Sequence, residues 1–427
     1  MVITLFQNYV EDGSWDFRGE DTKEYTHCFH IYPAMMIPQI ARKLITLYGA
    51  NGTFLFDPYC GTGTSLVEGR LAGMNVAGTD LNPTARLISE SKLEDYDENA
   101  LASAIHHFSD ELQTELSKLS EDYRVFAEPS CVSFERLETW FPPLSISEVS
   151  FCLDKIRSLE VKQEYKKFLL VCLSECLRLI SYQRNNEFKL YRISPEERPS
   201  HYVPLFGILK NRLDRNQEGV RNFLSRVKKE TTAEVYSFNT VVESGEQLLS
   251  QPNPSIVVTS PPYGDSPTTV AYAQFSWLTN VWFDLDPRTP GALDKVLMGG
   301  RKSELKPLGF GPLDSAISSI GDEDQKRATE VMNFFEEYYI SIQNVASILE
   351  EGGYACYVVG NRSVKGVTLP TDQFTAWAFE KAGLEYVCTH TREIPNKRMP
   401  STNSPSNVAG ETGKTMDKEY IVVCKKN

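Results

Sequence analysis

The sequence predicts an α/β fold in which a doubly wound sheet is split by a mostly helical insertion. Three observations support this prediction. A strand, a glycine loop, a helix, a second strand and an acidic residue follow one another within residues 52–80. Long helical patterns then occupy residues 96–234. Alternating strand and helix patterns resume after the insertion, as expected for layered α/β proteins.

The first part of the sheet is predicted from the start of the chain. An amphipathic helix is expected over 37–48, and an apolar strand over 52–57 leads into the glycine loop Pro58–Thr64. A helix over 65–72 and a strand over 75–80 follow. This order, with an acidic residue ending the second strand, is typical of a βαβ nucleotide-binding unit.

The inserted part is predicted to be helical. Its helical patterns lie over residues 100–119, 147–159, 162–180 and 211–229. A polar, arginine-rich stretch over 181–202 precedes the last of them. We therefore expect residues 96–234 to form a helical insertion, and residues 1–95 and 235–427 to form one domain together.

After the insertion, the sheet pattern returns. Strands are expected over residues 235–242, 256–259, 352–359, 385–390 and 420–424, and helices over 329–350 and 372–382. Residues 286–325 and 394–415 have an irregular pattern. Each of these two stretches is expected to be a long functional loop or a small subdomain.

Composition narrows the class of protein. A hydrophobic content of 41% and a charged content of 24% are ordinary for a globular chain. The longest apolar stretch, residues 168–180, contains Glu175 and Arg178 and is too short and too polar to span a bilayer. Residues 1–8 lack the basic flank and apolar core of a secretory signal. Nine scattered cysteines without a CxxC pair predict neither a zinc site nor a disulfide framework, so a cytoplasmic location is expected.

The charge distribution leaves two interpretations open. The formal net charge is −13, although nucleic-acid-binding surfaces are usually basic. Residues 178–229, however, contain twelve Lys or Arg and only five Asp or Glu. A basic segment on an acidic body is expected for a local contact with a polyanion, and equally for a solvated helical face.

The tetrad Ser260-Pro261-Pro262-Tyr263 directly follows an apolar strand. Two consecutive prolines remove two backbone N–H donors and fix φ at both positions, so the flanking groups are held in one pose. A hydroxyl at Ser260 and a ring at Tyr263 suit a planar substrate with an exocyclic amine, because the ring can stack while the hydroxyl and a carbonyl accept hydrogen bonds. Tyr272 and Phe275 are further candidates for the wall of this site. An ordinary proline-rich turn is the alternative.

The glycine loop and its neighbouring acids indicate a small nucleotide-like ligand. Gly61 and Gly63 allow close approach of the backbone, and Asp80 ends the second strand, where carboxylates typically hold ribose hydroxyls. Neither a P-loop nor a complete GxGxxG motif is present. Asp57 would repel a diphosphate and attract an ammonium group, which favours S-adenosyl-L-methionine over NAD or ATP. A structural glycine turn with a surface aspartate is the alternative.

These motifs carry a resemblance to a known family. Residues 56–64, F-D-P-Y-C-G-T-G-T, resemble the D-P-F-x-G-S-G-T cofactor signature of amino-group DNA methyltransferases. Residues 259–263, T-S-P-P-Y, resemble the catalytic signature of that family, in the S-P-P-Y form that is more typical of cytosine-N4 than of adenine-N6 enzymes. Residues 27–34 are similar to the N-terminal element that covers the methionine end of the cofactor, and residues 418–424 to the closing strand.

The resemblance implies a Rossmann-like, S-adenosylmethionine-dependent methyltransferase fold and assigns roles to particular residues. The implied cofactor-binding residues are Tyr32, Pro33, Asp57, Tyr59, Cys60, Gly61, Thr62, Gly63, Thr64, Asp80 and Leu81. The implied catalytic residues are Ser260, Pro261, Pro262 and Tyr263, with the Tyr263 ring stacked on a flipped base. Residues 242–246 depart from the adenine-contacting pattern of the family, with Glu in place of Asp.

Two basic segments are candidates for contacts with DNA. The candidate DNA-binding residues are Arg184, Lys189, Arg192, Lys397 and Arg398. Such side chains hold phosphates and read base edges. The first three lie in the insertion, which makes residues 96–234 the candidate target recognition region. A solvated surface is the alternative for both segments.

The activity expected from the resemblance is site-specific methylation of the N4 amine of cytosine in double-stranded DNA, with a flipped target base and a cognate restriction endonuclease. Methylation at carbon-5 would need a thiolate nucleophile, and the catalytic turn contains no cysteine. Methylation of adenine N6, methylation of guanine N2 in RNA, and a non-catalytic DNA-binding subunit are the alternatives. The recognition sequence and the oligomeric state are left open.

Overall fold

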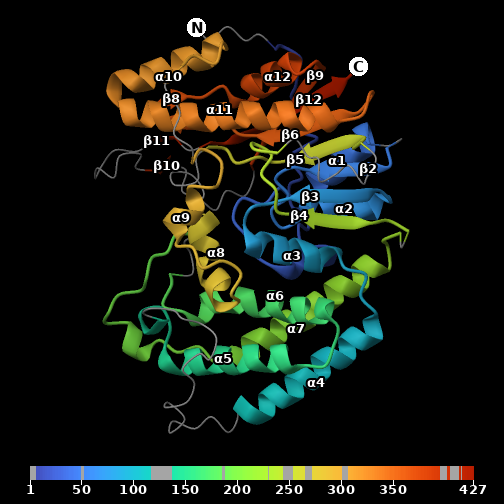
Figure 1. The fold of residues 1–427 in the computed structure, drawn as a ribbon, viewed down its shortest axis with the longest axis vertical. Coiled ribbons are helices and arrows are strands. Elements are labelled where there is room, and N and C mark those ends of the chain that lie inside the picture. Colours follow the sequence, from blue (N-terminus) through green and yellow to red (C-terminus); the bar gives the residue numbers. More distant parts are fainter. Residues whose placement is uncertain are drawn as a thin grey trace.

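The structure is a computed structural model that describes residues 6–49, 52–116, 137–184, 188–228, 230–243, 253–264, 272–300, 306–394, 402–403, 413–414 and 416–427. An eight-stranded sheet forms its centre (Figure 1). In spatial order its strands are β1 (Tyr9–Val10), β9 (Leu384–Glu393), β12 (Lys418–Lys426), β6 (Tyr354–Val359), β5 (Ile256–Thr259), β2 (Phe54–Asp57), β3 (Asn75–Thr79) and β4 (Ala233–Tyr236).

The strand order reverses between β2 and β5. From β2 the chain moves outward to β3 and β4, and it then returns to place β5 on the other side of β2, with Phe56 opposite Val257. Within this eight-stranded sheet the strand pairs are parallel except for those of β12, which is antiparallel to both β6 and β9. The predicted doubly wound α/β fold is confirmed. A reversal of this kind opens a crevice at the carboxyl ends of the two strands.

Helices cover both faces of the sheet because its central strands are apolar on both sides. On one side are α1 (Pro38–Tyr48), α2 (Thr64–Ala72) and α3 (Pro83–Leu93), and on the other α10 (Gly311–Glu323), α11 (Gln325–Ile348) and α12 (Thr371–Lys381). Leu55 and Val258 belong to the core beneath α1 and α2. Their neighbours Phe56 and Val257 belong to the opposite core, which includes α11 and α12.

The chain between β3 and β4 is largely helical. After α3 it forms α4 (Glu98–Leu116), α5 (Pro143–Ser158), α6 (Gln163–Ile180) and α7 (Leu205–Leu224). These helices gather at the end of the molecule opposite α11 (Figure 1). They form a third core around Phe168 and Leu173, to which α8 (Tyr272–Trp282) contributes Trp282. Helix α8, which follows the diproline turn, therefore packs against the helical part.

The remaining elements are short. Among the residues that the structure describes, they are 3-10 turns at Tyr25–Phe29, Leu137–Thr139 and Arg198–Ser200, helix α9 (Pro290–Asp294), the pair β7 (Ser363–Val364) and β8 (Val367–Thr368), and the pair β10 (Thr402–Asn403) and β11 (Gly413–Lys414). The cysteines in the described part of the chain are all free thiols. Among the described residues, none of the helices has the length and apolar character needed to cross a membrane.

Several predicted elements have different limits in the structure, and residues 286–325, predicted to be irregular, contain α9 and α10. Two predicted elements differ most. The strand predicted over 235–242 ends at Tyr236. The side-chain oxygen of Asn239 accepts a hydrogen bond from the backbone N–H of Val241 at 2.9 Å, so the chain turns away from the sheet there. The helix predicted over 211–229 begins at Leu205 and ends at Leu224, because buried leucines at helical spacing already face the third core from residue 205 onward.

Candidate functional site

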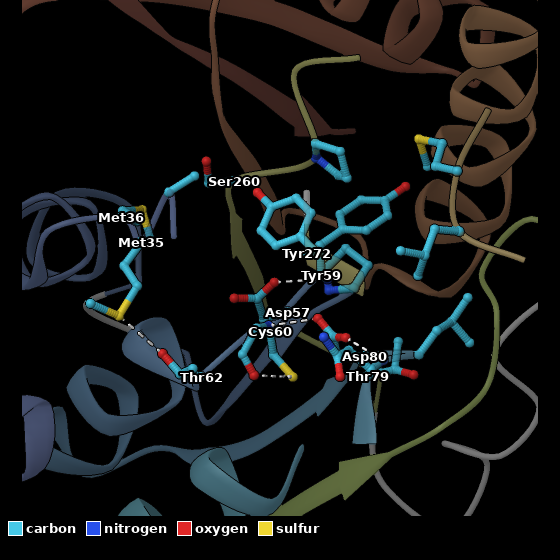
Figure 2. Close-up of a pocket in the computed structure, with 18 of the residues that line it drawn as sticks. Met35, Met36, Asp57, Tyr59, Cys60, Thr62, Thr79, Asp80, Ser260 and Tyr272 are labelled. Atoms are coloured by element: carbon cyan, nitrogen blue, oxygen red, sulfur yellow. Dashed lines mark hydrogen bonds between the residues drawn. The ribbon is translucent and has the colours of Figure 1, made fainter. Parts of the chain in front are cut away.

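A pocket opens at the carboxyl ends of β2, β3 and β5, where the strand order reverses (Figure 2). It contains about 1060 Å³ of empty space, open solvent at its mouth included. The predicted site residues that line it are Tyr32, Pro33, Asp57, Tyr59, Cys60, Gly61, Thr62, Thr64, Asp80, Leu81, Ser260 and Pro262. The glycine loop and the diproline turn therefore share one pocket.

The two glycines of the loop have different surroundings. Gly63 has φ +79° and does not line the pocket, and a Cβ atom there would lie 2.4 Å from the Ser89 Oγ on α3. Gly61 has φ +50° and lines the pocket, and no atom lies within 4 Å of the place of its missing Cβ. Gly63 is therefore explained by packing, whereas Gly61 leaves open space for a ligand.

Asp57 is the last residue of β2 and is buried. Its Oδ1 accepts hydrogen bonds from the backbone N–H of Tyr59 at 3.0 Å and from the Thr259 hydroxyl at 2.5 Å, and its Oδ2 accepts one from Ser65. Burial raises the pKa of Asp57 to about 6, although these bonds oppose the rise. The side chain therefore joins β2 to β5 and is a carboxylate at neutral pH.

Asp80 follows β3 and is fixed by backbone donors. Its Oδ2 accepts from the N–H of Gly61 at 3.1 Å, and its Oδ1 accepts from the N–H of Asn82 at 2.7 Å. Burial raises the pKa of Asp80. Two carboxylates, Asp57 and Asp80, thus face one pocket (Figure 2), which disfavours a phosphate and favours a ligand with hydroxyls and a positive charge.

The segment after the first 3-10 turn forms one wall of the pocket. The Tyr32 hydroxyl accepts a hydrogen bond from Asn82 Nδ2 at 2.8 Å, and the Tyr32 ring is stacked on Tyr272 with 6.0 Å between centroids. The Thr62 hydroxyl donates to the sulfur of Met35 at 3.3 Å (Figure 2). Aromatic and thioether groups therefore lie next to the glycine loop.

Several lining residues were given no role by sequence reasoning. They are Ala34, Met35, Met36, Pro58, Ser65, Thr79, Asn82, Phe238, Asn239, Thr240, Leu297 and Met298. Tyr272, one of two aromatic candidates, lines the pocket, whereas Phe275 packs in the third core. The adenine-contacting element was sought at residues 242–246, of which 244–246 lie outside the described residues. Because the strand was predicted to extend to residue 242, no turn was expected after β4. Residues 238–240 of this turn line the pocket.

The diproline turn carries a series of side-chain hydrogen bonds. The Ser260 Oγ lies 3.2 Å from the Tyr263 hydroxyl oxygen, and the Tyr263 hydroxyl donates to Oε1 of Glu419 on β12 at 2.9 Å. Neither Pro261 nor Tyr263 lines the pocket. Stacking of Tyr263 on a base therefore stays a prediction, whereas Tyr272 is among the residues that line the cavity (Figure 2).

The basic candidates of the insertion lie on a surface next to α8. Arg184, Lys189 and Arg192 are exposed. The backbone N–H of Leu190 donates to Oε1 of Gln274 on α8 at 3.0 Å, two residues after the pocket-lining end of that helix. Lys397 and Arg398 lie outside the described residues.

The histidines near the N-terminus are buried. His27 Nε2 lies 2.9 Å from Oε1 of Glu68, and burial lowers the pKa of both His27 and His30, the latter to about 4. Within the described ranges, no group of three or more His, Cys, Asp or Glu side chains is arranged to hold a metal ion. The contacts of His27 are those of a packed, hydrogen-bonded side chain.

Comparison with known proteins identifies relatives. The chain is 35% identical over 432 residues to the type II methyltransferase M.MvaI of Kocuria varians, covering 96% of this chain and 93% of the relative. It is 31% identical over 125 residues to the type II methyltransferase M.MjaII of Methanocaldococcus jannaschii, covering 26% and 24% of the two chains. A match of 42% over 52 residues, or 12% of this chain, relates it to a tRNA (guanine(10)-N2)-dimethyltransferase of Methanothermobacter thermautotrophicus, of which it covers 16%.

A family profile described as "RMKL-like, methyltransferase domain" matches residues 23–117, the stretch that contains the glycine loop and Asp80. The pocket fits S-adenosyl-L-methionine: Asp57 and Asp80 supply negative charge, Gly61 leaves open space, and aromatic and thioether groups form a wall. From the near full-length identity with M.MvaI, the chain belongs to the type II methyltransferase family and uses S-adenosyl-L-methionine as its methyl donor.

Proposed function

We propose that this chain is a site-specific DNA methyltransferase that acts on the N4 amine of cytosine in double-stranded DNA. One observation carries the proposal: Ser260 and Pro262 line the same pocket as Asp57 and Asp80. A methyl donor on the glycine side and an exocyclic amine on the diproline side can therefore meet in one cavity. Sequence similarity to type II methyltransferases supports DNA as the substrate and a cognate restriction endonuclease as a partner.

The residues of the pocket act by positioning. The Ser260 hydroxyl accepts a hydrogen bond from the target amine, which turns the nitrogen lone pair out of conjugation with the ring. Bound S-adenosyl-L-methionine supplies a methyl group from its sulfonium centre. Asp57 holds the ammonium end of this cofactor, and Asp80 holds its ribose hydroxyls. Tyr272 offers the flipped base an aromatic surface.

The state of Cys60 supports amine chemistry over carbon-5 chemistry. Cys60 lines the pocket on its cofactor side, and burial raises the pKa of its thiol well above the usual range. A thiol that keeps its proton is a poor nucleophile for attack on a pyrimidine ring. Transfer to an exocyclic amine needs no enzyme nucleophile.

The basic segment of the insertion that carries Arg184, Lys189 and Arg192 supports DNA as the substrate. Arg184, Lys189 and Arg192 are exposed on a segment that contacts α8, and Tyr272 at the start of α8 lines the pocket. A duplex that delivers a flipped base to this pocket passes beside these side chains. Their positive charge provides phosphate contacts on a protein whose net charge is −13.

The decisive experiment measures transfer of a tritiated methyl group from S-adenosyl-L-methionine to plasmid DNA. Ser260→Ala should lower the rate about 10²- to 10³-fold, as expected for loss of one positioned catalytic group. Ser319→Ala, an exposed serine on α10, is the matched control and should leave the rate unchanged. Near-normal transfer by Ser260→Ala would remove Ser260 from the catalytic machinery.

Identification of the methylated nucleoside by mass separates the alternatives. N4-methylcytosine supports the proposal, and N6-methyladenine would redirect the same pocket to adenine. Methylation of tRNA in place of DNA would favour guanine-N2 chemistry, the activity in the name of the tRNA (guanine(10)-N2)-dimethyltransferase that matches 52 residues. Cofactor binding without transfer to DNA or RNA would leave a non-catalytic DNA-binding subunit.

A further inference from the structure

A chain of three hydrogen bonds leads from the pocket to the antiparallel strand β12. The Ser260 Oγ lies 3.2 Å from the Tyr263 hydroxyl, which donates to Oε1 of Glu419 at 2.9 Å. The other carboxylate oxygen of Glu419 accepts from Nη1 of Arg392 on β9 at 2.8 Å. Glu419 and Arg392 are direct partners in the register of the two strands.

The charges of Arg392 and Glu419 determine the donor-to-acceptor direction of these hydrogen bonds. Arg392 and Glu419 have side chains that are 6% and 16% exposed, and they form an opposite-charge pair across the strands. A carboxylate paired in this way only accepts hydrogen bonds, so the Tyr263 hydroxyl hydrogen points to Glu419. The Tyr263 oxygen is then left to accept, and the hydrogen it accepts is that of the Ser260 hydroxyl.

The direction determines what Ser260 presents to the pocket. Its single hydrogen is directed toward Tyr263, so lone pairs of its oxygen face the cavity. An exocyclic amine, which offers two N–H donors, needs such an acceptor. With the chain reversed, Ser260 would present its hydrogen to the amine, and two donors would face each other. The same reversed hydroxyl would instead suit a ring carbonyl.

The ring of Tyr263 is held tightly enough to keep this geometry. A Cβ atom on Gly360, the residue after β6, would lie 2.9 Å from the ring, so the ring rests against that backbone. Burial and the nearby Glu419 charge raise the pKa of Tyr263 well above the usual range, so its hydroxyl keeps the proton that it donates.

We propose that Glu419, held by Arg392, is a positioning residue that acts through Tyr263 to make Ser260 a hydrogen-bond acceptor, and that this polarity selects an exocyclic amine over a ring carbonyl. The inference rests on the proposed function, because it assumes that Ser260 contacts the target amine. Glu419 itself touches neither cofactor nor substrate in this scheme.

The test exploits the amide of glutamine. In Glu419→Gln, Arg392 can only be satisfied by the amide oxygen, so the NH2 group turns toward Tyr263 and donates to it. The Tyr263 hydroxyl then donates to Ser260, and the whole chain reverses. We expect kcat to fall about 10²- to 10³-fold, with the KM for cofactor and for DNA changed less than about threefold.

Tyr263→Phe distinguishes an effect of hydrogen-bond direction from a purely structural role of Glu419. It keeps the ring but removes the link, so Ser260 is free to rotate, and we expect a fall in kcat of only about tenfold. The double variant Glu419→Gln/Tyr263→Phe should therefore be faster than Glu419→Gln alone and match Tyr263→Phe. A purely structural Glu419 would make the double variant no faster than the Glu419→Gln single variant, which would overturn the inference, as would a near-normal Glu419→Gln.

Two measurements keep the outcomes separate. Binding of S-adenosyl-L-methionine by calorimetry reports whether each variant is folded. If Glu419→Gln fails to bind, the test depends on Tyr263→Phe alone. An undiminished kcat in Tyr263→Phe would then contradict the inference. Ser260→Ala reports on the proposed function. If Ser260→Ala is inactive but the double variant shows no recovery, only the role of Glu419 is lost; if Ser260→Ala stays active, the catalytic assignment itself is lost.

Discussion

The two sides of the pocket are built in different ways. On the glycine side, Asp57, Gly61 and Asp80 are close in sequence, and backbone N–H groups hold both carboxylates in place. On the diproline side, Ser260 is oriented through side chains that end at Glu419, on the last strand of the sequence. A binding turn can therefore be encoded locally, whereas the polarity of one hydroxyl depends on residues that only the fold brings together.

One side chain connects the two sides. Thr259, which immediately precedes Ser260, donates to Asp57 across the adjacent strands β5 and β2. Both residues are buried. The cofactor side and the base side are therefore fixed relative to each other at the point where the strand order reverses.

The largest expected effect tests how local the glycine side is. Gly63→Ala should lower the free energy of unfolding by about 3 kcal/mol, because a left-handed φ and contact with Ser89 are both unfavourable for a residue with a Cβ atom. Gly61→Ala, with the same kind of φ but open space, should cost about 1 kcal/mol and mainly weaken cofactor binding. Urea unfolding measures both, and equal losses would contradict the packing role of Gly63.

The next effect tests the connection between the sides. Thr259→Val should lower the free energy of unfolding by about 2 kcal/mol, because it leaves a buried carboxylate oxygen of Asp57 with one donor fewer. It should also raise the pKa of Asp57, since the Thr259 bond opposes the effect of burial. Thr259→Ser keeps the hydroxyl and is the matched control. Unchanged stability in Thr259→Val would show that the bond is dispensable.

A third prediction concerns pH and the cofactor side alone. The pKa of Asp57 is raised to about 6, and the ammonium of the cofactor needs the carboxylate form. Affinity for S-adenosyl-L-methionine should therefore be full above this pH and fall about tenfold for each unit below it. Calorimetry between pH 8 and pH 5 measures the change. Asp57→Asn should bind more weakly and without this dependence; the same pH profile in that variant would assign the titration to another group.

The smallest effect concerns the basic segment that carries Arg184, Lys189 and Arg192, which lies outside both sides of the pocket. Lys189→Ala should raise the KM for DNA about threefold and reduce the slope of log affinity against log salt by about 0.9, with cofactor affinity unchanged. Lys326→Ala, an exposed lysine on α11, serves as the control. Equal effects of the two substitutions would indicate a general charge effect instead of a DNA contact.

The features that could be predicted from the sequence are those that depend on local contacts, and the features that were missed depend on distant ones. The strand, loop and helix around Gly61 were predictable, because apolar runs, glycines and an acid at a strand end are local signals. Most cofactor-side candidates line the pocket as expected, although their roles stay predictions. The place of Phe238 and its neighbours in the pocket was missed because the β-branched residues that follow β4 predicted a longer strand than the structure has. Lys397 and Arg398 lie outside the described residues and are untested.

The order of the elements and the two motifs that meet in the pocket follow from the sequence alone, since helix, strand and turn preferences act over a few residues. The bond from Thr259 to Asp57, the packing of Gly63 on Ser89, and the pairing of Glu419 with Arg392 behind Tyr263 depend on the tertiary structure. The first and the last of these contacts join neighbouring strands, so they depend on strand order and register, which local sequence preferences do not specify.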